Sequence, residues 1–140
     1  MRFEGRVFKV GRHWAVEVPI LGVVTQGRTR NDALEMIADA VESLVNKKGF
    51  EVAVFRGYGE HFEIGASHQA ALTALLLRRE RLKAGLSLAQ VAARLGAKSL
   101  NAYARYEQGR TTPSVQKLSE LLSVVVPQGD FVLVESRARS

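Results

Sequence analysis

Residues 85–96 constrain the fold of this chain more than any other stretch. Gly85 can end a preceding helix in the left-handed conformation, and the Ser87 side chain can accept a hydrogen bond from a free amide of the next turn. Apolar residues then recur at helical spacing from Leu88, and Gly96 breaks the periodicity. The pattern predicts a short helix that begins at Leu88 and ends in a tight turn at Gly96.

The segment after Gly96 predicts a second, amphipathic helix with Tyr103 and Tyr106 turned inward. Its opposite face is polar and can enter the major groove of DNA, where Asn pairs with adenine and Arg with guanine. The predicted DNA-binding residues are Lys98, Asn101, Ala102 and Arg105 on the outward side, with Gln90, Arg94 and Ser99 nearer the phosphate backbone. Two alternatives stay open: a plain helical bundle, and a solvated ion pair of Arg105 with Glu107 or Glu120.

The same region carries the pattern Gly-Leu-Ser-x₃-Val-Ala-x₂-Leu-Gly, followed by Arg-Tyr-Glu-x-Gly-Arg-x₂-Pro-Ser. This pattern resembles the Cro/Xre class of helix-turn-helix domain over residues 77–125, and the resemblance implies DNA binding. The chain departs from the class at Leu88, where members often carry a phosphate-binding Gln. The segment between Gly96 and Tyr103 is also one residue longer than in the class.

Charge is distributed unevenly along the chain. Residues 1–66 hold nine Lys and Arg against nine Asp and Glu, whereas residues 67–140 hold eleven against five and carry the whole net charge of +6. A basic half that coincides with the predicted turn and helices favours contact with phosphates. The chain holds no cysteine, which excludes disulfides, thiolate catalysis and Cys-ligated zinc. No apolar run is long enough for a membrane span or a signal peptide, so a cytoplasmic location is expected.

The first part of the chain predicts an α+β fold. Alternating apolar residues indicate strands over residues 2–10, 14–18, 23–26 and 50–55. Residues 29–32 form a variant of the capping box before a helix with one apolar stripe that ends near Val45. The helix should cover one face of a small antiparallel sheet. Trp14 and Leu34 fall on the apolar sides of their elements and are expected in the core.

This part also carries a family pattern, with Trp-Ala-Val-Glu-Val-Pro at residues 14–19, Leu-Gly at 21–22 and Thr-Gln-Gly-x-Thr-x₂-Asp-Ala-Leu at 25–34. The pattern resembles the N-terminal domain of the HicB antitoxins over residues 5–55, although residues 19–22 are one residue shorter than the family's Pro-Gly turn and lack its second proline. The family joins such a domain to a Cro/Xre-type domain. The resemblance implies a reduced ribonuclease H-like fold, a HicA-like mRNA-cleaving toxin as partner, and repression of the protein's own operon.

These patterns predict a division of the chain into four parts. The HicB-like domain is expected over residues 1–56, a glycine-rich linker over 57–68, the helix-turn-helix domain over 69–127, and a C-terminal strand and tail over 128–140. One helix-turn-helix reads too few bases for useful specificity, so a homodimer or a higher even oligomer is expected. The apolar run at residues 130–135 is the candidate seam, because an exposed strand edge can pair with another copy.

The sequence does not predict an enzyme. Two-metal hydrolysis needs convergent carboxylates, whereas the predicted strands offer only Glu4, Glu17 and Glu51, singly. His61, Glu63 and His68 lie in the predicted linker without the spacing of a metal site, so neither metal nor cofactor is expected. Besides the antitoxin, two hypotheses remain: a free-standing regulator whose N-terminal domain senses a ligand or oligomerises, and a degenerate hydrolase.

Overall fold

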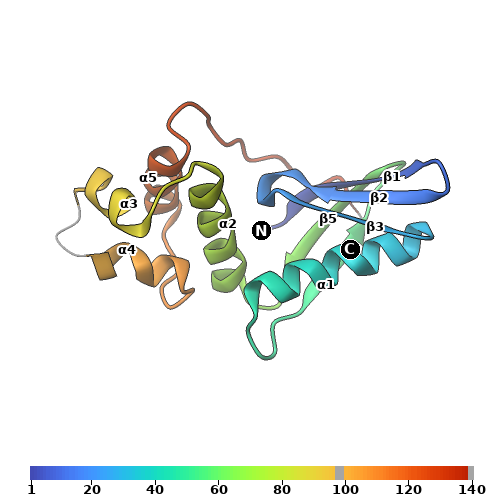
Figure 1. Ribbon diagram of the computed structural model, residues 1–140, viewed down its shortest axis with the longest axis horizontal. Helices are drawn as coiled ribbons and strands as arrows, with labels where there is room; N and C mark the ends of the chain where they lie inside the picture. The colour runs from blue at the N-terminus through green and yellow to red at the C-terminus, as the bar shows by residue number, and fades with distance from the viewer. Residues whose placement is uncertain (97–99, 139–140) are drawn as a thin grey trace. The chain divides into compact units, whose positions relative to one another are not determined.

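The computed structural model describes residues 1–96 and 100–138, and the chain forms two compact units (Figure 1). The first unit contains Met1–Gln69 together with the C-terminal segment that begins at Glu135. The second unit is formed by Ala70–Val134. The chain therefore leaves the first unit, builds the second, and returns to the first.

The first unit is a five-stranded antiparallel sheet with one helix. Its strands lie in the order β3-β2-β1-β5-β4, and the helix α1, Arg30–Val45, lies across one face (Figure 1). A short 3₁₀ turn at Pro19–Leu21 joins β2 to β3. The five strands are β1 at Phe3–Val10, β2 at His13–Val18, β3 at Val23–Gly27, β4 at Val52–Arg56 and β5 at His61–Ala66. The predicted α+β architecture is confirmed.

Local sequence explains where α1 begins and ends. Thr29 is its N-cap, and the Thr29 Oγ1 accepts a hydrogen bond from the Asp32 amide at 3.0 Å. The Asp32 carboxylate accepts in turn from the Arg28 amide at 2.9 Å, so one amide of the first turn and one amide before the helix are satisfied. The helix ends at Asn46, which adopts the left-handed conformation with φ of 50°.

The core of the first unit lies between α1 and the sheet. Leu34 is 3% exposed, which confirms its predicted place in the core. Trp14 is only half-buried, so the prediction of a core Trp14 is wrong; the buried part of β2 begins at Val16. The buried side chains of this layer are Phe3, Val7, Val16, Val18, Leu21, Val23, Ala33, Leu34, Ile37, Val41, Phe62 and Ile64.

The predicted linker at residues 57–68 contains a strand, which corrects that expectation. β5 lies between β1 and β4, with Ile64 opposite Phe3 on one side and Val54 on the other. Gly57 and Gly59 precede this short run and Gly65 lies within it, which obscures its alternation in the sequence. β5 pairs on one side with β4, its neighbour across the turn at residues 57–60, and on the other side with β1, and no local pattern records the distant pairing with β1.

The described residues of the second unit form four helices. They are α2 at Gln69–Lys83, α3 at Leu88–Arg94, α4 at Leu100–Glu107 and α5 at Val115–Val125. Ser114 caps α5, because its Oγ accepts a hydrogen bond from the Lys117 amide at 3.1 Å. Val91, Tyr103, Leu121 and Val125 are buried. In the part of the chain that the structure describes, no helix is both long and apolar enough to cross a membrane.

The strand predicted within residues 128–140 is not present in the described part of that range, residues 128–138. Val132, Leu133 and Val134 are instead 83%, 88% and 62% exposed. An apolar β-branched run forms a strand only where another strand offers its backbone hydrogen bonds. No strand within residues 1–96 and 100–138 pairs with these residues, so the prediction of a strand is wrong for the described part of the single chain.

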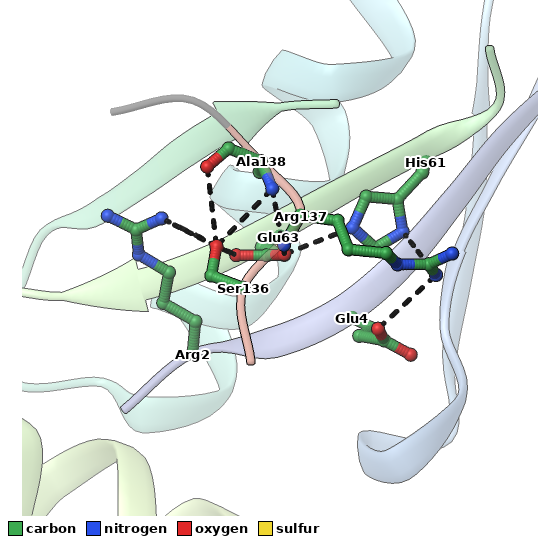
Figure 2. Close-up of polar contacts among 7 residues, drawn as sticks. All are labelled: Arg2, Glu4, His61, Glu63, Ser136, Arg137 and Ala138. Carbon is green, nitrogen blue, oxygen red and sulfur yellow. Dashed lines mark hydrogen bonds and ion pairs between the residues drawn. The ribbon is translucent and has the colours of Figure 1, made fainter. Parts of the chain in front are cut away.

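Residues 136–138 dock on the sheet face opposite α1, around the buried carboxylate of Glu63 (Figure 2). The Ser136 Oγ donates to it at 2.5 Å, and the Arg137 and Ala138 amides donate at 3.0 and 3.2 Å. Burial alone would raise the pKa of Glu63, but hydrogen bonds from Ser136, His61 and the two amides outweigh it and lower the pKa to about 2. Glu63 is therefore an anion at neutral pH, held by its neighbours.

A close backbone approach at the end of β3 leads to a test of the fold. A Cβ added at Gly27 would lie 2.3 Å from the backbone nitrogen of Ala33 in α1. Gly27→Ala should therefore push β3 away from α1 and lower the free energy of unfolding by about 1 to 3 kcal/mol. Trp14, the only tryptophan, pairs with Gly27 in the sheet, so its fluorescence during urea unfolding reports this region.

Gln26→Ala is the matched control, because Gln26 is the exposed neighbour on the same strand. It should leave the urea midpoint nearly unchanged. Equal midpoints for the two variants would show that β3 and α1 are not in close contact at Gly27.

Candidate nucleic-acid interface

The turn between α2 and α3 forms through two caps. Gly85 has a φ of 71°, and the amides of Gly85 and Leu86 donate back to the Leu82 and Arg81 carbonyls at 3.0 and 3.1 Å. This pattern is the Schellman motif, which satisfies carbonyls at the end of α2. Ser87 follows as the N-cap of α3. The predicted helix end at Gly85 and helix start at Leu88 are both confirmed.

Gln90 has a structural role in this cap. The Ser87 Oγ accepts from the Gln90 amide at 3.1 Å, and the Gln90 Oε1 accepts from the Ser87 amide at 2.8 Å. The reciprocal pair is a capping box. The side-chain oxygen of Gln90 is thus occupied, and its side-chain NH₂ remains the group suited to donate to a phosphate.

The helix α3 has one buried and one exposed face. Val91 and Ala92 are buried at 0% and 6% exposure. Arg94 is exposed, on the same side of the helix as Gln90 and Ala93. The structure therefore places both residues that were predicted on α3, Gln90 and Arg94, on one solvent-facing surface.

The helix α4 presents its polar side to solvent. Tyr103 is 1% exposed and Tyr106 is half-buried, whereas Asn101, Ala102 and Arg105 are exposed. Positions 101, 102 and 105 share one side of a helix because successive residues are about 100° apart. The predicted orientation of α4 is confirmed for these three residues. Lys98 and Ser99 lie outside the described residues.

A bidentate ion pair joins α2 to α4. The Arg81 Nε and Nη2 donate to the two carboxylate oxygens of Glu107 at 2.8 and 3.0 Å, and the two side chains are 12% and 6% exposed. The Arg81 Nη1 also donates to the Leu86 carbonyl in the turn before α3, at 2.9 Å. The hydrogen bond from Arg81 to Glu107 raises the pKa of Arg81. One guanidinium therefore fastens α2, the turn and the end of α4.

No sequence pattern predicts this pair. Glu107 belongs to a recognised family pattern and Arg81 to a basic stretch, but the two are 26 positions apart. The pair also decides the alternative for Arg105, since both oxygens of Glu107 bind Arg81, and Glu120 pairs with Lys117 at 3.3 Å. Within residues 1–96 and 100–138, no ion pair joins Arg105 to either carboxylate.

The Tyr103 side chain lies beside this pair. Its hydroxyl is buried, and no hydrogen bond of acceptable geometry reaches it from the described residues, because both Glu107 oxygens are directed to Arg81. Burial, and secondly the nearby Glu107 carboxylate, raise the pKa of the Tyr103 phenol. The Tyr103 side chain therefore packs in the core of the second unit as a neutral phenol.

Several of the acidic and histidine side chains considered for catalysis or metal binding contact other side chains. Glu4 pairs with Arg137 at 3.5 Å, and Glu17 pairs with Arg6 at 3.7 Å. His61 contacts Glu63 at 3.0 Å, whereas His68 contacts Lys47 at 3.3 Å. In the described part of the chain, no group of three His, Asp or Glu side chains could hold a metal ion.

The comparisons with known proteins bear on the second unit. Residues 77–124 match a family model described as Helix-turn-helix. No curated protein matches the chain. The matched residues run from α2 through α3 and α4 into α5, so the C-terminal part of the chain is similar to helix-turn-helix domains of the Cro/Xre type. This match supports a DNA-binding transcription regulator.

The ion pair between Arg81 and Glu107 should determine the stability of this interface. Arg81→Ala leaves the buried Glu107 carboxylate without its partner, which should cost about 3 kcal/mol. The loss should appear as faster amide hydrogen exchange at Tyr103 in the full-length protein. Arg110→Ala, which removes an exposed arginine just beyond α4, is the matched control. If the two variants exchange Tyr103 at the same rate, the pair does not hold α4 in place.

Proposed function

We propose that the protein is a type II antitoxin that represses its own operon through the helix-turn-helix and neutralises a HicA-like mRNA-cleaving toxin through the sheet unit. The observation that carries the proposal is the exposed side of α4, where Asn101 and Arg105 stand free of the core while Arg81 and Glu107 fix the helix behind them. Both activities act in the cytoplasm. The protein needs no cofactor for either.

DNA readout is assigned to two groups of residues. Asn101 and Arg105 on α4 are proposed to contact base edges, with Ala102 between them close to the groove. Gln90 and Arg94 on the exposed side of α3 are proposed to contact phosphates, which position the protein without specifying sequence. Lys98 and Ser99, between the two helices in sequence, complete the proposed set.

The toxin-binding role rests on the first unit and on its resemblance to the HicB domains. Several residues of that pattern build the sheet and its helix: Val16 and Leu21 lie in the core, Gly27 admits the close approach of α1, and Thr29 caps it. They support the proposed domain type, and they leave the exposed positions between them available for a partner. The first unit would then bind the toxin, and the second unit would bind the operator DNA.

A cavity in the first unit favours a second candidate, a free-standing regulator that senses a ligand. The cavity has a volume of about 410 Å³, within the range of small-molecule sites. Arg2 stacks on the Phe55 ring at 3.4 Å from its centroid beside this cavity. The lining residues are Met1, Arg2, Glu51, Val52, Ala53, Phe55, Gly65, Ala66, Ser67 and Gln69.

DNA readout can be tested with an operator duplex, selected by the wild-type protein from a random pool, and a random duplex of equal length. Arg105→Ala should weaken operator binding about 5- to 150-fold, because a lost bidentate contact to guanine costs about 1 to 3 kcal/mol, and should affect the random duplex much less. Lys98→Ala should weaken both duplexes alike and reduce the slope of log affinity against log salt by about one.

The matched control is Arg12→Ala, which removes an exposed arginine from the hairpin between β1 and β2. It should change neither duplex. If wild type, Arg105→Ala and Lys98→Ala bind the operator equally at low and at high salt, the α4 surface does not read DNA, and the repressor role fails with it.

The antitoxin role can be tested by co-expression with the product of an adjoining HicA-like reading frame. The toxin alone should arrest growth, and co-expression should restore growth and yield a stable complex. The first unit, residues 1–69 together with the C-terminal tail, should be required both for the restored growth and for the stable complex. Arg105→Ala should preserve both, because α4 is proposed to bind DNA. A neighbour that stays toxic and forms no complex would favour the free-standing regulator.

A further inference from the structure

The C-terminal residues combine two features that the rest of the fold does not explain. Residues 136–138 are bound tightly to Glu63, yet Val132, Leu133 and Val134 immediately before them are 83%, 88% and 62% exposed. An apolar run of this exposure is costly in water and commonly marks an interaction surface. The same short segment thus contains a docked part and an unpartnered part.

Glu63 has the properties of a binding site for an extended peptide. It is 3% exposed, and its carboxylate takes one hydroxyl and two consecutive backbone amides from residues 136–138 (Figure 2). Arg2 and His61 supply the remaining contacts at 3.4 and 3.0 Å. Without the peptide, a buried anion would keep only these two partners, so the site needs an occupant.

Two side contacts surround the docked segment. The Arg137 guanidinium reaches the Glu4 carboxylate at 3.5 Å, on the strand next to Glu63. The serine at 136 also accepts a hydrogen bond from Arg2 at 3.3 Å. These contacts fit a serine followed by a basic residue, which is the sequence that this chain itself carries at 136 and 137.

The contacts do not require that the occupant belong to the same molecule. Residues 126–134, which lead to the docked segment, contain neither helix nor strand. Nine extended residues span up to about 30 Å, enough to cross to a neighbouring molecule. Exchange of an identical terminal segment between copies reproduces every contact of the single chain and is a common route to dimers.

We propose that the Glu63 site binds residues 135–138 of a second copy of this chain, so that two chains exchange their C-terminal segments in a two-fold homodimer. This inference rests on the proposed function in one respect, because a repressor with one helix-turn-helix per chain needs two copies to read two half-sites. It adds to that function the Glu63 site at which the two chains bind, the residues 135–138 that bind there, and the exchange of segments by which the dimer assembles.

The exposed apolar run points to contact with a second copy, and tail exchange brings the two runs together. When two chains exchange tails, the two connecting segments run past each other in opposite directions about the two-fold axis. Val132, Leu133 and Val134 of each can then pair as an antiparallel ladder, which buries their side chains and joins their backbone amides and carbonyls. Docking within one chain leaves the same three residues in water, as their exposures show.

Cross-linking between singly labelled chains distinguishes the two arrangements. The chain contains no cysteine, so Glu4→Cys and Arg137→Cys each introduce one thiol at the facing positions beside the site. The two variants are co-expressed with different affinity tags and treated with a short bis-maleimide. Exchange predicts covalent dimers that carry both tags. Arg12→Cys paired with Arg137→Cys is the control for chance collisions, since Arg12 lies beyond the far end of β1.

The double variant with both cysteines in one chain completes the experiment. Exchange predicts covalent dimers from it, whereas docking within one chain predicts covalent monomers and no more dual-tag product than the Arg12→Cys control. Truncation after Val134 should convert the dimer to a monomer in light scattering under the exchange arrangement. A truncated chain that remains dimeric, or a double variant that yields only covalent monomers, overturns the proposal.

Operator binding separates this inference from the proposed function. The double variant could give covalent monomers while the protein still binds its operator as a dimer. In that case tail exchange is wrong, the dimer forms through another interface, and the repressor role is retained. If dual-tag dimers form and the protein binds no operator, tail exchange is right and the repressor role is wrong.

Discussion

The carboxylate of Glu63 is the point on which the organisation of the chain depends. It lies in β5, receives Arg2 from just before β1 and His61 from β5 itself, and binds residues 136–138 after the second unit is complete. A buried carboxylate remains ionised only when several donors surround it, and the donors here come from β5 itself and from near both ends of the chain. The first unit is consequently closed by residues from both of its ends, and the helix-turn-helix is connected to it at two points.

In the second unit, too, a buried carboxylate is held by hydrogen-bond donors from another part of the chain. Glu107 is buried, and its two oxygens are taken by one arginine from α2, so that α4 is fixed at its end by a planar, bidentate contact. Tyr103 fills the space beneath the helix in neutral form. These residues hold α4 from its buried side, whereas Asn101 and Arg105 lie exposed on the other side and make no ion pair within the described part of the chain, so they are available to a ligand. Rigid support behind an exposed polar face is what sequence readout in a DNA groove requires.

The two units differ in how far their function can be derived. The match of residues 77–124 to a helix-turn-helix family and the exposed face of α4 point to the same activity, DNA binding by a transcription regulator. In the first unit, the residues that carry the resemblance to HicB domains are core, turn and cap residues, which specify a fold rather than a ligand. The toxin-binding role is accordingly a proposal that rests on the joining of two domain types in one chain.

The sequence by itself determined the features that depend on neighbouring residues. The left-handed end at Gly85, the caps at Thr29, Ser87 and Ser114, and the inward and outward faces of α4 all arise from residues within four positions of one another, so periodicity and turn chemistry reveal them. Only the tertiary structure decided the strand status of β5, the absence of a strand at residues 131–134, the half-buried place of Trp14, and the partners of Glu63 and Glu107. These features depend wholly or in part on which distant segments meet, and a hydrogen bond or ion pair across 26 or 73 positions leaves no periodic trace in the sequence.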